Sequence, residues 1–574
     1  MMRSNSSRRW KGLRAPFRRI VCCLATTCLA LSNLVASACA AEPLHRIIDE
    51  QLTAALAAGG VPAADICDDA EFLRRLYLDL TGVIPPRETV LAFLADENPQ
   101  KRVAAIDRLL ASEAYARRMA VAFDVMLMER RPDKYITTDE WRAYLQASFA
   151  TNKPLDQLAA EVLGATGREP ELRPAARFFL DREVEQDVLV RDIGRLFLGA
   201  DLQCAQCHDH PDIAGYLHHH YHGLAVFVSG LKIFKREGQI SLQEKAVREI
   251  EFLSVFDLDN PQKTGPRLFE AVFETPALVV GEEYQEKPSA QTPMLPKFSL
   301  QQLLARRLPS AATPAFGRNL ANRLWAMMLG QGLVEPLDMQ HADNPPSHPE
   351  LLAALTEHLE ATGYDARDFL REIALSDAYQ RSSLLPADVD PARLPPESFG
   401  VANLKSLSPE QLFDSLLSAA EAAPLLARQI EQTLQEDAAA YQKLQDDPAA
   451  LAAAQSQGRA ERLAEFVMLF GSPPGQPEGP FQASLPQSLF LANSPLVQDW
   501  IEPADDNLAG RLLAEPDAEK VADELYLCVL SRRPTAAEKE LVQQHLESRG
   551  EARRLAVTEL LWATIASAEF RFNH

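Results

Sequence analysis

A cysteine pair followed directly by a histidine is the feature of this 574-residue chain with the most evident chemistry. Cys204-Ala205-Gln206-Cys207-His208 has the C-x-x-C-H spacing at which c-type haem is attached to proteins. Two thiols one helical turn apart can bond two vinyl groups, and the adjacent imidazole can then reach the iron from one side. The spacing therefore predicts Cys204 and Cys207 as the anchors of haem c and His208 as its axial ligand.

Three other interpretations of these residues stay open. In the first, the two thiols with His208 and His210 bind zinc or iron, which require about four ligands. In the second, Cys204 and Cys207 form a disulfide or a redox pair in an oxidising compartment. In the third, the pattern is a coincidence, because five-residue patterns recur by chance.

A cluster of four histidines, His218-His219-His220-Tyr221-His222, follows the C-x-x-C-H motif. On a helix, His218 and His222 share one face at i, i+4, which is a good spacing for two ligands of one ion. We expect them to bind a metal or to supply a sixth haem ligand, since no methionine lies between His208 and Met294. An exposed polar loop and an open, five-coordinate haem are the alternatives.

Residues 1–41 have the features of a secretory signal peptide. They carry seven basic and no acidic residues, an apolar stretch over 20–35 and the small-residue cleavage pattern Ala38-Cys39-Ala40. The apolar stretch is shorter than the ~20 residues of a stable transmembrane helix. We therefore expect an exported protein, periplasmic or at the cell surface, with no stable transmembrane anchor. An uncleaved anchor and a lipoprotein form stay open. Export agrees with the haem prediction, because c-type attachment occurs only after export.

The composition excludes some classes of partner. The whole chain has a formal net charge of −22, and loss of the seven basic residues of 1–41 takes the mature chain to −29. So acidic a protein is not expected to bind nucleic acid or an anionic membrane surface. Beyond residue 41 only Cys67, Cys204, Cys207 and Cys528 remain, so this is no disulfide scaffold. The sequence contains no G-x-S-x-G, H-E-x-x-H or Walker motif, and enzymatic activity stays open.

The hydrophobic periodicity is mostly helical and predicts a mainly α fold: two helical lobes with a small β-containing connecting segment. Helices are expected over 44–58, 70–80, 89–94, 102–110, 115–128, 184–197 and 314–329. Short β-branched runs such as 277–280 favour strands between 239 and 287. Capping-box patterns at 347–350 and 535–538 predict two helix starts in the second lobe. The expected domains are the signal peptide at 1–41, a helical domain with C-x-x-C-H at 42–235, a connector at 236–295 and a helical domain at 296–574.

Longer stretches of the chain resemble two known domains. Segments 71–82 and 197–211, with Pro85-Pro86, resemble the planctomycete cytochrome-C-like domain of unknown function 1549 (PSCyt2). The second lobe resembles the partner domain of unknown function 1553 (PSD1) at 319–325, 332–336, 344–352, 376–383, 407–412, 487–493 and 530–535. The cytochrome part of the first name rests largely on the C-x-x-C-H motif itself.

The resemblance implies an exported redox protein with haem at Cys204, Cys207 and His208, or else a non-haem metal-binding protein or a scaffold in extracytoplasmic polymer processing. Such proteins are frequently encoded beside exported proteins with domain 1501, which implies a protein of that type, or a redox partner, as the binding partner. One departure from the family concerns the site. Family members usually carry a Phe-Asp and Trp-containing segment after Pro211, where this chain has 212–216 and the histidine cluster.

Overall fold

The computed structural model describes residues 42–310, 312–386, 389–479 and 482–574. The predicted signal peptide at 1–41 lies outside these ranges. Within them the fold is mainly α, as the periodicity predicts, and the strands form only two-stranded sheets. No helix in the described part of the chain is long and apolar enough to cross a membrane.

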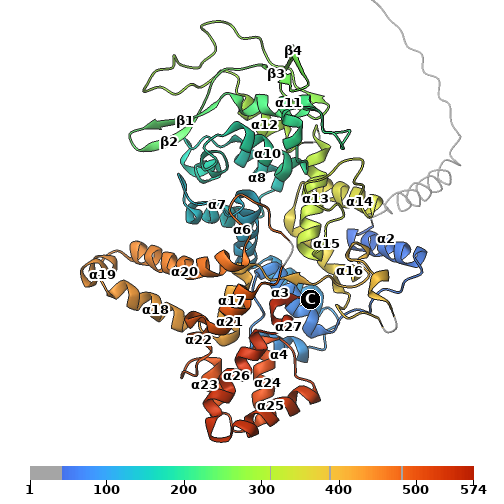
Figure 1. Ribbon diagram of the computed structural model, residues 1–574, viewed down its shortest axis with the longest axis vertical. Helices are drawn as coiled ribbons and strands as arrows, with labels where there is room; N and C mark the ends of the chain where they lie inside the picture. Colours follow the sequence, from blue (N-terminus) through green and yellow to red (C-terminus); the bar gives the residue numbers. More distant parts are fainter. Residues whose placement is uncertain (1–41, 311, 387–388, 480–481) are drawn as a thin grey trace, which may run out of the picture.

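The first part of the chain is helical up to the histidine cluster (Figure 1). Its α-helices are α2 (Leu44–Ala58), α3 (Asp69–Thr81), α4 (Arg87–Ala95), α5 (Lys101–Leu110), α6 (Glu113–Met128), α7 (Thr138–Ala150), α8 (Leu155–Gly164), α9 (Arg177–Leu180), α10 (Gln186–Leu198) and α11 (His218–Ser229). Short 3₁₀ helices are η1 (Pro170–Leu172), η2 (Pro174–Ala176) and η3 (Gln203–Gln206). The predicted helix over 44–58 coincides with α2, and the others predicted here agree to within two residues at each end.

Three small antiparallel hairpins follow α11. They pair β1 (Leu231–Arg236) with β2 (Gln239–Glu244), β3 (Ile250–Ser254) with β4 (Asp257–Thr264), and β5 (Arg267–Leu268) with β6 (Ala271–Val272). The predicted strand at 277–280 does not form. Val280 is 93% exposed and Val279 is 57% exposed, so this β-branched run has no neighbouring strand to pack against.

The second part of the chain returns to helices. It contains α12 (Leu300–Arg307), α13 (Pro314–Leu329), α14 (Pro349–Ala361), α15 (Ala366–Leu375), α16 (Asp377–Gln380), η4 (Pro391–Arg393), η5 (Pro396–Ser398) and the short strand β7 (Lys405–Ser406). The predicted capping box at Ser347 is wrong: α14 begins at Pro349, its N-cap is His348, and no side chain caps it. A proline disfavours helical dihedrals in the residue before it, and His348 is accordingly non-helical, with φ −133° and ψ 86°.

The last part of the chain forms a separate helical group. Its elements are α17 (Pro409–Ala420), α18 (Ala423–Gln435), α19 (Ala438–Gln445), α20 (Pro448–Phe470), α21 (Leu485–Asn493), α22 (Pro495–Ile501), α23 (Leu508–Ala514), α24 (Ala518–Val529), α25 (Ala536–Arg549), η6 (Gly550–Ala552), α26 (Arg553–Ile565), α27 (Ala568–Arg571) and β8 (Phe572–Asn573). The predicted capping box at 535–538 is confirmed, with Thr535 and Glu538 bonding each other's backbone N–H groups at the start of α25.

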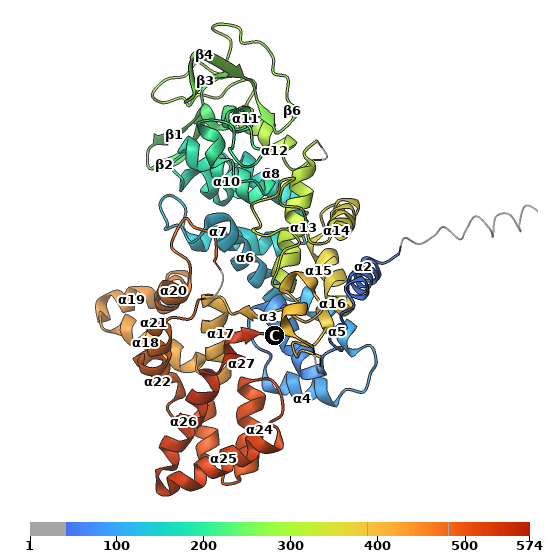
Figure 2. The same ribbon diagram turned by 45° about the vertical axis from the view of Figure 1, so that its right-hand side comes forward.

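Two hydrophobic cores lie under these elements. The first takes nearly all its buried side chains from residues 44–379, and so joins α2–α11 to α12–α16. The second takes nearly all its side chains from residues 407–570. Figure 2 shows the corresponding division, with α24, α25 and α26 at the lower end of the molecule. The sequence segment at 296–574 is therefore shared between two cores, and the boundary between the cores falls near residue 400.

The two cores are joined through a buried carboxylate on α3. Asp79 is 4% exposed and accepts hydrogen bonds from Tyr379 Oη at 2.9 Å, Lys405 Nζ at 2.5 Å and Asn573 Nδ2 at 2.8 Å. Lys405 and Asn573 belong to the paired strands β7 and β8. One acidic side chain thus fixes three segments that are far apart in sequence.

Candidate functional site

The C-x-x-C-H motif follows directly on α10. This helix ends at Gly199, whose φ of 66° is a left-handed conformation that favours glycine. The next residues pair with a distant segment: Asp201 N donates to Asp338 O at 3.0 Å, and Gln340 N donates to Gly199 O at 2.9 Å. The chain reaching Cys204 is therefore held by backbone bonds to residues well over a hundred positions later.

A buried ionic network lies on α10 just before the motif. Its centre is Asp192, fully buried, with Arg182 at 2.6 Å, Arg191 at 2.8 Å, Arg131 at 3.1 Å and Arg195 at 3.2 Å. Burial alone would raise the pKa of Asp192, but the surrounding guanidinium groups outweigh burial and hold the pKa well below its ordinary value. The carboxylate stays ionised and holds α10 in place.

The same network extends to the segment that pairs with the motif. Arg195 donates to Glu129 at 2.5 Å and to Asp338 at 3.3 Å. Asp338 also accepts, through its backbone oxygen, the N–H of Asp201. Arg195 and Asp338 therefore fix where the chain enters the C-x-x-C-H motif.

The two thiols of the motif are exposed and unpaired. Cys204 lies within η3 and Cys207 directly follows it, and neither forms a disulfide in this structure. Cys67 and Cys528, in contrast, are buried. The backbone N–H of Val255, in the turn between β3 and β4, donates to Cys207 O at 3.1 Å. The β3–β4 hairpin is thereby placed against the motif.

His208 has one ring nitrogen bound and the other available. Its Nδ1 lies 2.6 Å from Asp209 O; because a carbonyl oxygen only accepts, Nδ1 carries the proton. Nε2 then presents a lone pair, which is the arrangement typical of histidines that bind metals. The ring of Phe256 lies 5.0 Å from the His208 ring, so an apolar group flanks this imidazole.

His210 is oriented differently. Its Nδ1 accepts the backbone N–H of Asp212 at 3.1 Å and that of Ile213 at 3.0 Å. Since Nδ1 accepts, the neutral ring carries its proton on Nε2 and has no lone pair left for an ion. The ring packs edge-on against Tyr216 at 6.1 Å. His210 thus closes the turn after the motif.

His218 and His222 come together at the start of α11, as their i, i+4 spacing predicts. Their Nε2 atoms are 2.9 Å apart, and both approach Gln206 O, at 3.1 Å from His218 and 3.2 Å from His222. Phe252 of β3 stacks on the His222 ring at 4.3 Å. Burial lowers the pKa of His222 to about 4, with the neighbouring His218 adding to the shift, so the ring is neutral at pH 7.

His219 and His220 lie near Glu270. His220 Nε2 is 3.1 Å from Glu270 Oε1, and its Nδ1 is 3.1 Å from Gly215 O. Among the His, Cys, Asp and Glu side chains that the structure describes, only His219, His220 and Glu270 place three ligand atoms within 4.8 Å of one another. Sequence reasoning missed Glu270, because it is fifty residues from His220 and no local pattern connects the two.

Comparison with known protein families agrees with these segments. Residues 47–232 match the family PSCyt2, described as protein of unknown function (DUF1549), and residues 301–546 match PSD1, described as protein of unknown function (DUF1553).

The chain is a PSCyt2–PSD1 protein.

No curated protein and no solved structure matches it. In this PSCyt2–PSD1 protein the motif of one domain is held by the other: Cys204 lies in the PSCyt2 segment, and Asp338 in the PSD1 segment. His341 of PSD1 packs edge-on against Tyr216 at 5.6 Å, and its side chain is only 9% exposed. The surroundings of the motif therefore require both domains.

The predicted metal ligands of the PSCyt2 domain are not gathered into one cage. Cys204, Cys207, His208 and His210 do not supply three ligand atoms within 4.8 Å of one another. A tetrahedral zinc site needs all its ligand atoms within about 4 Å of one another, given Zn–S bonds of about 2.3 Å and Zn–N bonds of about 2.0 Å. Covalent haem has no such requirement, because its two thioether bonds lie at the edge of the ring, away from the iron.

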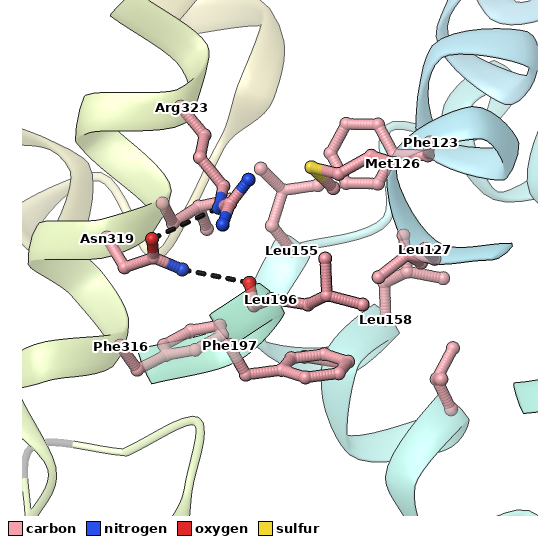
Figure 3. A pocket seen from close by; sticks show the side chains of 13 residues that line it. Phe123, Met126, Leu127, Leu155, Leu158, Leu196, Phe197, Phe316, Asn319 and Arg323 are labelled. Atoms are coloured by element: carbon pink, nitrogen blue, oxygen red, sulfur yellow. Dashed lines mark hydrogen bonds between the residues drawn. The ribbon is translucent and has the colours of Figure 1, made fainter. Parts of the chain in front are cut away.

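An apolar cavity of about 30 Å³ lies between α6, α8, α10 and α13 (Figure 3). At its polar edge Asn319 donates to Leu196 O at 2.8 Å and accepts from Arg323 Nε at 3.1 Å. A water molecule needs ~10–15 Å³ of such space, so the cavity has room for one or two waters and for no larger ligand. It is a packing gap between the PSCyt2 and PSD1 segments.

Proposed function

We propose that this PSCyt2–PSD1 protein is an exported redox protein that carries c-type haem at Cys204 and Cys207, with His208 as the axial ligand. When bound, haem supplies one-electron oxidation and reduction. The observation that carries the proposal is the state of His208: its Nδ1 is bound to Asp209 O at 2.6 Å, and its Nε2 is left with a lone pair beside two unpaired, exposed thiols.

The thiols of Cys204 and Cys207 have the access that covalent attachment needs. Both residues are exposed, so the attachment machinery can reach them after the chain is exported. Each Sγ would bond one vinyl group of the ring, and the backbone of Cys207 is already fixed by the N–H of Val255.

The hydrogen bonding of His208 supports its proposed role as the ligand of the haem iron. The hydrogen bond from Nδ1 to Asp209 O fixes the tautomer and the ring orientation and raises the basicity of Nε2. The motif is placed by backbone bonds and by the Arg195–Asp338 ion pair, so this imidazole is held by the fold and not only by its own loop.

The β3–β4 hairpin supplies apolar surface beside His208. Phe256 is 81% exposed, Leu258 68% and Val255 53%. Large apolar side chains exposed together at one place mark a binding surface. In our proposal these side chains would exclude water from the bound haem, and exclusion of water is one of the factors that set a haem's reduction potential. The partner is a second exported redox protein or an exported protein with domain 1501.

A visible spectrum and a pyridine haemochrome assay test the proposal, on protein exported from a host with the c-type maturation machinery. We expect a covalent haem signal from the wild-type chain and none from Cys204→Ala/Cys207→Ala. His210→Ala is the matched control and keeps the signal, because this ring points its acceptor nitrogen into its own turn. A colourless, folded wild-type protein would rule out haem.

A further inference from the structure

The imidazoles of His218 and His222 form a second feature, distinct from the ligand set proposed for haem. Three electron-rich atoms meet there: His218 Nε2, His222 Nε2 and the carbonyl oxygen of Gln206. The three edges of this triangle measure 2.9, 3.1 and 3.2 Å. Both ring nitrogens face the same oxygen.

Hydrogen bonds cannot account for all three of these short contacts at the same time. Gln206 O only accepts, and each neutral imidazole has a single N–H. If one of the two Nε2 atoms carries its proton, the other presents a lone pair to the carbonyl oxygen at a distance of about 3 Å. If both carry their protons, two N–H groups face each other across 2.9 Å. A cation bound by all three atoms removes the conflict.

The size of the triangle fits a transition metal. Ligand atoms about 2.1 Å from an ion and about 90° apart lie about 3 Å from one another. We propose that His218 Nε2, His222 Nε2 and Gln206 O form one face of a binding site for a divalent first-row metal ion such as Zn²⁺ or Cu²⁺. Imidazole nitrogen suits these ions better than it suits Ca²⁺ or Mg²⁺. Water molecules complete the coordination.

The surroundings favour a cation. The carboxylate of Asp209 accepts the backbone N–H of His218 at 2.8 Å and lies beside the site. Asp187 accepts the hydroxyl of Tyr221 at 2.7 Å and acts electrostatically on His222. Phe252 covers the pair, edge-on to His218 at 4.8 Å and stacked on His222. Two nearby negative charges and an apolar cover strengthen the binding of a positive ion.

The ion would connect the C-x-x-C-H motif to α11. Gln206 lies between the two cysteines, so its carbonyl can be a ligand only when the motif is seated against the helix. The site uses neither thiol and not the ring of His208. It therefore does not rest on the haem proposal, and either can fail without the other.

The test uses the full exported chain, freed of metal with a chelator. Equilibrium dialysis with Zn²⁺ gives the stoichiometry and affinity, and electron paramagnetic resonance with Cu²⁺ counts the coordinated imidazole nitrogens. We expect one ion bound through two imidazoles. We expect its affinity to fall by about 100-fold or more in His218→Gln/His222→Gln. His219→Gln removes a ligand of the His219–His220–Glu270 cluster on the same helix turn and should keep the affinity, whereas loss of the ion in this variant would place the ion at that cluster and contradict our site.

Two other results would overturn the inference. One is an unchanged affinity in folded His218→Gln/His222→Gln. The other is loss of the ion in Cys204→Ala/Cys207→Ala with retention in the double histidine variant, which places the ion at the thiols. If the double variant does not fold, the Cu²⁺ spectrum of the wild-type chain decides, since fewer than two coupled nitrogens contradict the site. Covalent haem is measured separately on the same samples.

Discussion

Val255 donates its backbone N–H to the carbonyl oxygen of Cys207 at 3.1 Å, and this bond places the β3–β4 hairpin against the C-x-x-C-H motif. The bond is formed between backbones, so it leaves no trace in the sequence. Through it, the exposed ring of Phe256 comes to lie beside His208. The hairpin belongs to the segment between the PSCyt2 and PSD1 matches, which gives that connector a part in the proposed site.

Replacement of Phe256 with serine tests whether the connector contributes to the proposed haem site. Phe256 is 81% exposed, so Phe256→Ser should leave the unfolding midpoint unchanged. If haem lies beside His208, loss of the ring admits water and lowers the midpoint reduction potential by on the order of tens of millivolts. Val280→Ser, 93% exposed and outside the β3–β4 hairpin, is the control. Equal potentials in both variants and the wild type would show that Phe256 does not cover the redox centre.

Gly199, at the end of α10, is a second position where the fold determines how the chain enters the C-x-x-C-H motif. Its φ of 66° is strained for other residues, and a Cβ there would lie 2.8 Å from both Asn319 Oδ1 and Gln340 Nε2. We expect Gly199→Ala to lower the free energy of unfolding by about 2–4 kcal/mol. Gly60→Ala separates the two causes, because Gly60 has φ 61° but a Cβ added there would meet no atom within 4 Å. Denaturant unfolding measures both; equal losses would exclude the collision.

The buried carboxylate of Asp192 should carry a large share of the stability. Asp192→Asn leaves Arg182 and its neighbours buried without their charge partner, which costs about 3–5 kcal/mol. Asp506→Asn, which breaks an exposed pair with Arg428, is the control and should have no measurable effect. Urea unfolding of the three proteins at pH 7 gives the comparison.

The pH dependence of the same variant gives an independent check. The pKa of Asp192 in the folded protein lies below the value of about 3.9 expected for the unfolded chain. Its ionised form therefore contributes fully above about pH 4, and the contribution is lost as the pH falls below that value. The difference in stability between wild type and Asp192→Asn should shrink on acidification; a constant difference would contradict the ionic origin.

The shared core predicts how fragments behave. Residues 42–295 contain the whole PSCyt2 match, but α8 packs on α12 and α10 packs on α13, both from the later part of the chain. We expect fragment 42–295 to aggregate or to bind a hydrophobic dye, because Leu304 and Trp325, which are buried in the full chain, are missing from it. Fragment 42–404 is the comparison and should be more soluble in size-exclusion chromatography. A monomeric, well-folded 42–295 would show that the first core does not need PSD1.

Local patterns predicted seven helices by residue range, and each agrees with the structure to within two residues at either end. The helix over 314–329 has its apolar residues at helical spacing and glycine at its end, and α13 has those bounds. The failures were local conflicts: Pro349 keeps His348 out of the helix, and the run at 277–280 has no strand beside it. Hydrophobic periodicity indicates which residues can form a helix or a strand. Whether a strand forms also depends on which other segments the fold places beside it.

The site was predictable only in part, for the same reason. The i, i+4 spacing placed His218 beside His222. It could not place Gln206 O between them, since a backbone carbonyl has no sequence pattern of its own. Phe252 and Glu270 come from hairpins thirty to fifty residues away, with no motif to connect them to the histidines. Contacts of this kind become visible only in the folded chain.

The placement of the two cores has a consequence for recombination between related genes. The PSCyt2 segment and the first part of the PSD1 segment fill one core together, so their buried side chains must change in step. A recombination event between two relatives near residue 296 would join surfaces that had diverged separately. The same event near residue 407 would keep each core almost entirely from a single parent. Recombination among such genes should therefore leave most crossovers near residue 407 and few near residue 296.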